Sequence, residues 1–203
     1  DLHRHEDFGF TPGFQAYDLG LTDFPYDYER LFDYRVLVWH NARLDVARMV
    51  GASILAHYCQ NGGGLVMTGG DNAFEWEFTD PANPINQYIP VIPKEDNLYR
   101  GLQQLNTPVA EHPVFKGVDL DALPWAFWTH HVELKTGTEA RVLLKAGEHP
   151  FLVELETEGQ RTMLVLAAPF GGKEQFQGEQ PFWEWSEWST LFANIVRYAG
   201  YGR

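Results

Sequence analysis

Apolar residues follow one another along the first half of the chain in a pattern that predicts strand, helix and strand. Residues 34–39 are almost continuously apolar, which is typical of a strand buried on both faces of a parallel sheet. Between residues 44 and 58 the apolar positions recur at three- and four-residue spacing, as on one face of a helix. Asn61 and Gly62 supply a helix stop, and residues 65–68 form a second apolar run. We therefore predict a βαβ unit with two parallel strands.

The second half of the chain has the pattern of short strands joined by tight turns. Residues 132–135, 141–145, 151–156 and 162–167 are rich in β-forming residues and are separated by turns that contain glycine. This close spacing predicts antiparallel hairpins, with the last strand rejoining the parallel part of the sheet. A final helix is predicted over residues 182–198. Its apolar positions form one core-facing stripe: Trp188, Leu191, Phe192, Ile195 and Val196.

Two further segments show little periodicity. Residues 1–33 are rich in Asp, Tyr, Phe, Gly and Pro, and only one short strand is predicted there, over residues 14–17. Residues 73–124 contain seven prolines, which leave room only for short helices or turns. We predict that this segment is a long excursion over one end of the sheet. No internal repeat or domain boundary is visible, so residues 1–203 are predicted to form a single domain.

Charge and composition exclude several classes of partner. The net charge of −13 and the pI near 4.9 leave no basic face for nucleic acid or for an anionic membrane surface. No stretch approaches the roughly 20 apolar residues of a membrane span. Cys59 is the only cysteine, which excludes an internal disulfide and a cysteine-based metal site but leaves the cellular compartment open. Aromatic residues make up 15% of the chain, which indicates either a large core with aromatic lids or a sugar-stacking surface.

The order of the first strand, the helix and the glycine-rich turn resembles the class I glutamine amidotransferase-like superfamily, in particular its ThuA-like branch and its uncharacterised amidotransferase-like members. The resemblance is carried by Asn61-Gly62-Gly63-Gly64-Leu65-Val66-Met67-Thr68-Gly69-Gly70 and by weaker similarities at residues 88–91 and 111–118. It implies an α/β fold: a three-layer flavodoxin-like sandwich with a largely parallel central sheet and an added antiparallel section. The family opens with a further strand and helix. Residues 1–33 are too short and irregular to supply both, which indicates a truncated or remodelled first unit.

The resemblance places a catalytic turn where this chain lacks the catalytic residues. Enzymes of this class hydrolyse glutamine with a thiolate on a strained turn after a strand, activated by a histidine. Here the turn reads Thr68-Gly69-Gly70-Asp71, and the segment expected to hold the histidine reads Pro169-Phe170-Gly171-Gly172. Thr68 is an alternative nucleophile, although a strand-end threonine usually satisfies its hydroxyl locally. Cys59 lies on the predicted helix, where we expect a small buried apolar side chain. We expect neither glutaminase activity nor a cofactor.

Ligands of open α/β sheets bind at the carboxyl ends of the parallel strands. The residues expected at that rim are His40, Asn41, Thr68, Gly69, Gly70, Asp71, Asn72, His130, Phe170 and Gly171. The N–H groups of Gly69 and Gly70 could bind an anion or a carboxylate, or the two glycines could serve the sharp turn alone. Asp71 and Asn72 could instead cap the following helix.

Histidines do not occur at a recognised metal-ligand spacing. His3 and His5 alternate, so a strand would place both on one face, whereas His130 and His131 are adjacent and would point in opposite directions. We therefore predict no metal site.

Two functions follow from these patterns. The first is a non-catalytic amidotransferase-like domain that binds a small ligand, with carbohydrate as a candidate, or that mediates assembly as a homo-oligomer or within a larger protein. The alternative is a hydrolase of another mechanism that uses His40, Asp71 or His130 with a metal or a water molecule.

Overall fold

Three parallel strands carry the half of the fold that the first apolar runs predict. The computed structural model describes residues 28–42, 48–70, 72–75, 80–109, 111–168 and 182–201. Within it, β1 (Val36–His40), α2 (Arg48–Gln60) and β2 (Gly64–Thr68) form the predicted strand–helix–strand unit, and β7 (Gln160–Val165) pairs with β2 in parallel. The βαβ prediction is therefore confirmed over the described residues. The strand predicted at residues 14–17 lies outside them.

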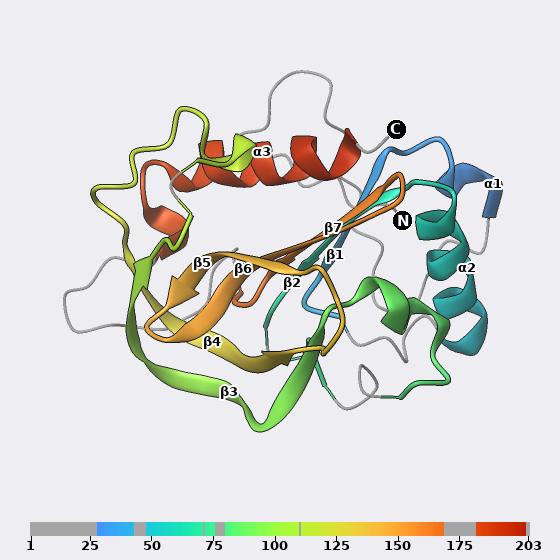
Figure 1. Cartoon of the computed structure of the whole chain (residues 1–203), viewed down its shortest axis with the longest axis horizontal. Helices are drawn as coiled ribbons and strands as arrows, with labels where there is room; N and C mark the ends of the chain where they lie inside the picture. Colours follow the sequence, from blue (N-terminus) through green and yellow to red (C-terminus); the bar gives the residue numbers. More distant parts are fainter. Residues whose placement is uncertain are drawn as a thin grey trace, which may run out of the picture.

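Over the described residues, the remaining elements extend this unit into one mixed sheet of seven strands in the order β1-β2-β7-β6-β5-β3-β4 (Figure 1). They are α1 (Tyr28–Leu31), η3 (Pro84–Tyr88), β3 (Val91–Asn106), η4 (Pro113–Phe115), β4 (Trp125–Leu134), β5 (Arg141–Ala146), β6 (His149–Thr157), η5 (Phe182–Glu184) and α3 (Trp188–Gly200). The β5–β6–β7 hairpins are antiparallel, and β7 rejoins the parallel strands as predicted. Among the described strands, antiparallel pairs outnumber parallel ones, so the expectation of a largely parallel sheet is wrong.

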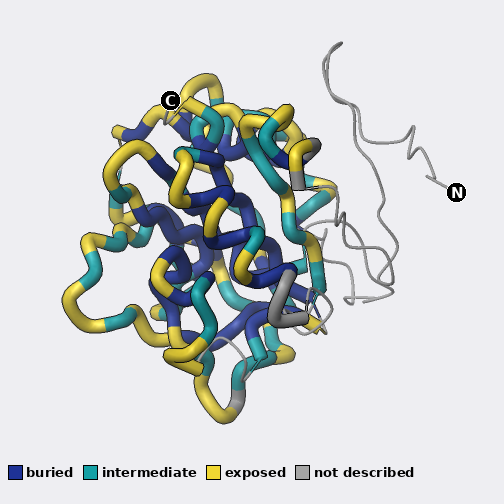
Figure 2. Tube along the Cα trace, turned by 90° about the vertical axis from the view of Figure 1, so that its right-hand side faces the viewer, coloured by how far each residue is buried: buried dark blue, intermediate teal, exposed yellow. Residues whose placement is uncertain are grey.

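Helices α2 and α3 cover opposite faces of the parallel strands, because side chains alternate along each strand. Leu65 and Met67 of β2 belong to the same apolar cluster as α2, whereas Val66 between them packs with α3. All five residues of the predicted α3 stripe are buried, which confirms that prediction. Buried residues run through the interior of the molecule, and exposed residues lie around its outside, on loops as well as on helices and strands (Figure 2).

Strand β3 is the largest difference between the structure and the prediction from sequence. The segment 73–124 was expected to hold only short helices and turns. In the structure its middle forms a strand of sixteen residues paired with β4. Two register shifts interrupt the pairing, between Pro93 and Leu98 and between Arg100 and Gln103, so no regular alternation of apolar and polar residues can develop. A strand of this kind cannot readily be recognised from the alternation of apolar and polar residues in its sequence.

The β3–β4 ribbon curls back onto the carboxyl end of the parallel strands. Thr129 of β4 forms an isolated antiparallel bridge with Ala167, and the His130 N–H donates to the Leu166 carbonyl at 2.8 Å. At its other end, β3 pairs with β5 through Leu105 and Asn106. The ribbon is thereby fixed at two places, and one of them is next to the rim that was expected to hold a ligand.

Candidate functional site

The carboxyl ends of β1 and β2 bring several predicted rim residues together. His40 and Thr68 are register partners, and His40 Nδ1 lies 2.7 Å from Thr68 Oγ1. Asn41 follows with a left-handed backbone (φ 42°), and its Oδ1 accepts a hydrogen bond of 2.9 Å from the Asn72 N–H. These two hydrogen bonds hold the end of β2 and the turn after it to the end of β1 and the turn after it.

The main-chain N–H groups of the glycine turn are engaged within the protein. Gly69 N–H is shared between the carbonyls of Val165 and Ala167, at 2.9 and 2.8 Å. Gly70 N–H donates to His130 Nε2 at 3.1 Å. An anion could reach these donors only if the β7 end or His130 moved away.

His130 connects the glycine turn to β3 through a chain of hydrogen bonds with assigned directions. Because Gly70 N–H donates to Nε2, Nδ1 carries the proton and donates to Asn97 Oδ1 at 3.0 Å. The Asn97 amide nitrogen in turn donates to the Phe74 carbonyl at 2.6 Å. Phe74 has a left-handed backbone (φ 53°), and its ring meets the His130 imidazole edge-on. The chain of contacts fixes one neutral tautomer of His130.

The His130 imidazole occupies the space beside the turn where a side chain would otherwise stand. It is only 1% exposed, and burial lowers the pKa of His130 from the ordinary 6.5 to about 4. A Cβ atom added to Gly69 would lie 2.5 Å from His130 Cδ2 and 2.8 Å from the Ala167 nitrogen. Both distances are below any normal contact, so position 69 has room only for glycine.

The rim residues share one edge of the sheet, although three of them cannot be placed. His40, Asn41, Thr68, Gly69, Gly70, Asn72 and His130 lie at or against that edge. Asp71, Phe170 and Gly171 lie outside the described residues. Asn97 belongs to the site but escaped the sequence analysis, because it lies in the strand that proline spacing concealed.

His131 points away from this site, as the adjacency of the two histidines predicts. Its ring stacks on Tyr99 on one side and on His149 at 3.7 Å on the other. Both ring nitrogens of His130 are engaged in hydrogen bonds, so a metal would have to displace Gly70 or Asn97. In the part of the chain that the structure describes, no three His, Cys, Asp or Glu side chains are grouped to hold a metal ion.

Cys59 is fully buried in α2, in the apolar cluster that includes Leu55 and Leu65. Burial raises the pKa of the Cys59 thiol from 9.0 to about 12. The thiol is therefore protonated at neutral pH and has none of the thiolate character that a nucleophile requires. This environment matches the expectation of a small buried apolar side chain.

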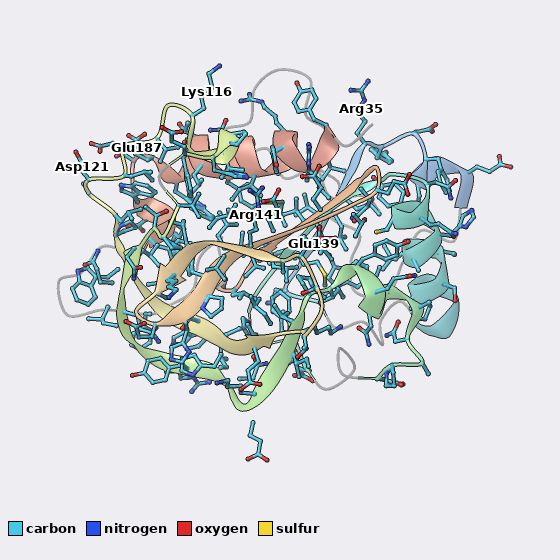
Figure 3. The ribbon with its side chains drawn as sticks, in the orientation of Figure 1. Arg35, Lys116, Asp121, Glu139, Arg141 and Glu187 are labelled. Carbon is cyan, nitrogen blue, oxygen red and sulfur yellow. The ribbon has the colours of Figure 1, made fainter. Side chains whose placement is uncertain are left out.

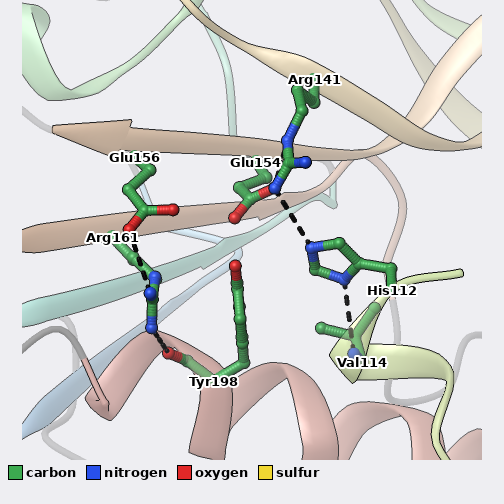
Figure 4. A network of polar contacts seen from close by, with 7 residues as sticks. All are labelled: His112, Val114, Arg141, Glu154, Glu156, Arg161 and Tyr198. Carbon is green, nitrogen blue, oxygen red and sulfur yellow. Dashed lines mark hydrogen bonds and ion pairs between the residues drawn. The ribbon is translucent and has the colours of Figure 1, made fainter.

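A second polar cluster, missed by the sequence analysis, lies between the antiparallel strands and α3 (Figure 4). Glu154 of β6 is 1% exposed, and its Oε2 accepts from the Arg141 guanidinium at 2.6 and 3.0 Å and lies 3.3 Å from His112 Nε2. His112 Nδ1 accepts from the Val114 N–H, so Nε2 carries the proton toward Glu154. Tyr198 of α3 directs its hydroxyl at the same carboxylate.

This second cluster holds several structural elements together and is not an accessible site. Burial by itself raises the pKa of Glu154, but hydrogen bonds from His112 and Tyr198 and the charge of Arg141 outweigh it and lower the pKa to about 2. His112 and Glu154 are buried and Tyr198 is half-buried, whereas Arg141 reaches solvent between α3 and the antiparallel strands (Figure 3). The cluster joins η4, β5, β6 and α3 through one buried carboxylate.

No helix in the described ranges is both long enough and apolar enough to cross a membrane.

Comparison with known proteins identifies the fold. No family model matches the chain, and no curated protein is significantly similar in sequence. Among solved structures, cytoplasmic protein STM3548 from Salmonella typhimurium is 21% identical with a TM-score of 0.73, over 88% of this chain and 77% of that one. A protein described as ThuA-like from Bacteroides uniformis is 17% identical with a TM-score of 0.59, over 89% and 74% of the two chains.

The same fold also forms part of a much longer chain. The β-galactosidase from Bacillus circulans sp. alkalophilus matches with a TM-score of 0.51 and 13% identity, over 83% of this chain but only 23% of its own. At these identities the likeness establishes the fold and leaves the activity open. The chain therefore has the α/β fold of ThuA-like proteins.

Gly69→Ala tests whether His130 fills the space at the turn. We expect the substitution to lower the free energy of unfolding by about 1–3 kcal/mol, because the new methyl group overlaps His130 and the Ala167 nitrogen. In a His130→Ala background the imidazole is gone, so the same change should cost measurably less in urea unfolding. An equal cost in both backgrounds would show that His130 does not define the space.

Glu154→Gln tests the second cluster. Removing this buried charge should cost about 1.5–3 kcal/mol at pH 7, because His112 and Tyr198 lose a charged hydrogen-bond acceptor, whereas the half-exposed Arg141 can be hydrated. Glu156→Gln on the same strand is the control: its ion pair with Arg161 is half-exposed and should be worth at most about 1 kcal/mol.

The Glu154 contribution has a defined pH window. Its native pKa lies below the unfolded value, so the stabilisation is complete above about pH 4.5 and is lost as the pH falls toward about 2. The difference in unfolding free energy between wild type and Glu154→Gln should shrink across that window. A difference that stays constant from pH 6 to 2.5 would contradict the buried carboxylate.

Proposed function

We propose that this chain is a non-catalytic amidotransferase-like domain that serves binding or assembly. The observation that carries the proposal is the position of His130, whose imidazole fills the space beside Gly69 and takes the Gly70 N–H. In an amidotransferase this turn presents a thiolate to the substrate carbonyl. Here Gly69 and Gly70 have no side chain to present, and the imidazole of His130 lies against them.

The remaining parts of the glutaminase machinery are also missing from their expected places. The single thiol belongs to Cys59, which is buried in α2 with a pKa of about 12. The sequence after β7 continues with Pro169 and Phe170 where the resemblance expects a histidine. His130, the imidazole beside Gly69 and Gly70, is neutral with both nitrogens engaged, so it cannot accept a proton from a nucleophile without breaking its bond to Gly70.

We further infer that the parallel half retains the three-layer flavodoxin-like arrangement of the superfamily. Support comes from β1, β2 and β7, which carry α2 on one face and α3 on the other. A retained scaffold with a closed turn is what a domain kept for binding or assembly would need.

Two observations support a role in binding or assembly. The fold accounts for 22–23% of two β-galactosidase chains, so it occurs there as one part of a larger protein. On the β3–β4 ribbon, Tyr99 and Trp125 are both 42% exposed, and exposed aromatic faces stack on sugar rings. Carbohydrate is therefore the small-ligand class that we propose.

One contact favours a second candidate, a hydrolase that uses Thr68 and His40. The 2.7 Å hydrogen bond between them is the geometry in which a histidine would activate a hydroxyl. However, Thr68 is only 1% exposed, so a substrate carbonyl could not reach its Oγ1 without rearrangement of the rim. A non-catalytic function is consistent with both the hydrogen bond between His40 and Thr68 and the burial of Thr68.

Glutamine hydrolysis is the direct test of the leading proposal. Purified protein should release glutamate from glutamine at the rate of a no-enzyme control, and Cys59→Ser should not change that rate. p-Nitrophenyl acetate, assayed with wild type and His40→Ala, tests the second candidate in the same way. Glutamate release that Cys59→Ser abolishes would overturn the proposal, and esterase activity that His40→Ala abolishes would replace it with the second candidate.

Carbohydrate binding is tested by titrating the protein with galacto-oligosaccharides and recording tryptophan fluorescence. We expect a saturable change that Trp125→Ala or Tyr99→Ala weakens, because each substitution removes one stacking face. Trp183→Phe, a partly buried ring outside the ribbon, is the control that should leave the affinity unchanged. Equal affinity in all variants would place the ligand elsewhere, and no binding would leave assembly as the role.

A further inference from the structure

Strand β1 lies at one edge of the described sheet, and large apolar side chains on it and near it are exposed to solvent. Val38 is 42% exposed, Tyr34 just before the strand is 40% exposed, and Tyr201 just after α3 is 67% exposed. The end of α3 meets β1 between them, because a Cβ on Gly200 would lie 2.8 Å from Val36 Cγ2. We call Tyr34, Val38 and Tyr201 the β1 patch.

A parallel strand is normally covered on both faces, whereas β1 is covered along one face and only at its start on the other. Leu37 and Trp39 pack against the cluster that includes α2. Val36 packs toward α3 on the opposite face, and Val38 shares that face by alternation. Since α3 reaches only the start of the strand, Val38 lies beyond its cover. The β1 patch is therefore an incompletely covered part of a sheet face that such folds usually bury.

Among the described strands β1 is an edge strand, and it lacks the features that discourage pairing. Its sequence, Val-Leu-Val-Trp-His, contains no proline, lysine or acidic residue, and its pairing with β2 has no bulge. Proteins that keep an edge strand from meeting another copy usually use one of these devices. Their absence favours contact with another polypeptide at this edge.

Charge favours a second copy as the occupant. The chain carries a net charge of −13, so most of its surface repels another copy of itself. The β1 patch is uncharged, and exposed Asp33 and Arg35 of opposite sign stand next to Tyr34. Arg35 projects outward near the end of α3 (Figure 3). In a two-fold contact, the apolar side chains of the two patches can pack together, and Asp33 of one copy can pair with Arg35 of the other.

We propose that two copies of this chain associate through the β1 patch about a two-fold axis. The proposal rests on the assembly role proposed above and names its partner. Three side chains bury less than the roughly 1,200 Å² of a stable interface, so neighbouring residues must add area or the dimer is weak. Salt should strengthen the dimer, because it screens the acid–acid repulsion of the remaining surface.

Sedimentation equilibrium of the full chain at low and moderate salt tests the proposal. We expect a reversible dimer whose dissociation constant falls when salt is added. Val38→Glu should raise that constant by on the order of tenfold or more, equivalent to about 1.4 kcal/mol. Ile92→Glu is the matched control, since Ile92 is a β-branched residue with 40% exposure on β3, away from β1, and it should have no effect.

A cysteine introduced at the patch locates the axis. Cys59 is buried with a raised pKa, so in Val38→Cys the new thiol is the only reactive one. Mild oxidation should give a disulfide-linked dimer for Val38→Cys and none for Ile92→Cys. A monomer at every concentration, or equal effects of the Val38 and Ile92 variants, would overturn the proposal.

A monomer whose Val38→Cys thiol resists labelling would overturn the proposal in another way, by showing that the same chain covers the patch. None of these outcomes affects the non-catalytic function, which glutamine hydrolysis tests separately.

Discussion

The arrangement of the rim depends on one hydrogen bond, from the Gly70 N–H to His130 Nε2. It joins the turn after β2 to the β3–β4 ribbon, two parts of the chain that are 60 residues apart. The bond requires a neutral imidazole with its proton on Nδ1, and Nδ1–H donates a hydrogen bond to Asn97 Oδ1. It also requires glycine at position 69, because any side chain there would overlap the imidazole. Closure of the turn by His130 and the requirement for glycine at position 69 therefore have the same physical cause.

The pattern of apolar and polar residues predicted those strands and helices in which the pattern is regular. Strands β1 and β2 are short and apolar, and α3 shows one apolar stripe, so propensity and burial point to the same structure. Strand β3 escaped prediction because its register shifts break the alternation of its side chains. The antiparallel share of the sheet was consequently underestimated.

The candidate site could be predicted only in part, for a related reason. The rule that ligands meet the carboxyl ends of parallel strands gathered His40, Asn41, Thr68 and the glycines at one edge, and the structure places them there. The use of Gly70 N–H by His130 depends on a strand pairing distant in sequence, which no local pattern encodes. The same is true of Glu154, whose partners His112, Arg141 and Tyr198 come from three other elements.

The most direct test of the account is the protonation state of His130, measured by nitrogen NMR of the imidazole across a pH titration. The structure predicts a neutral ring at pH 7 with the proton on Nδ1, an unprotonated Nε2, and a pKa near 4. It also predicts that the Gly70 amide signal shifts as His130 titrates. A ring that carries its proton on Nε2, or that titrates near the ordinary 6.5, would show that the imidazole does not close the turn.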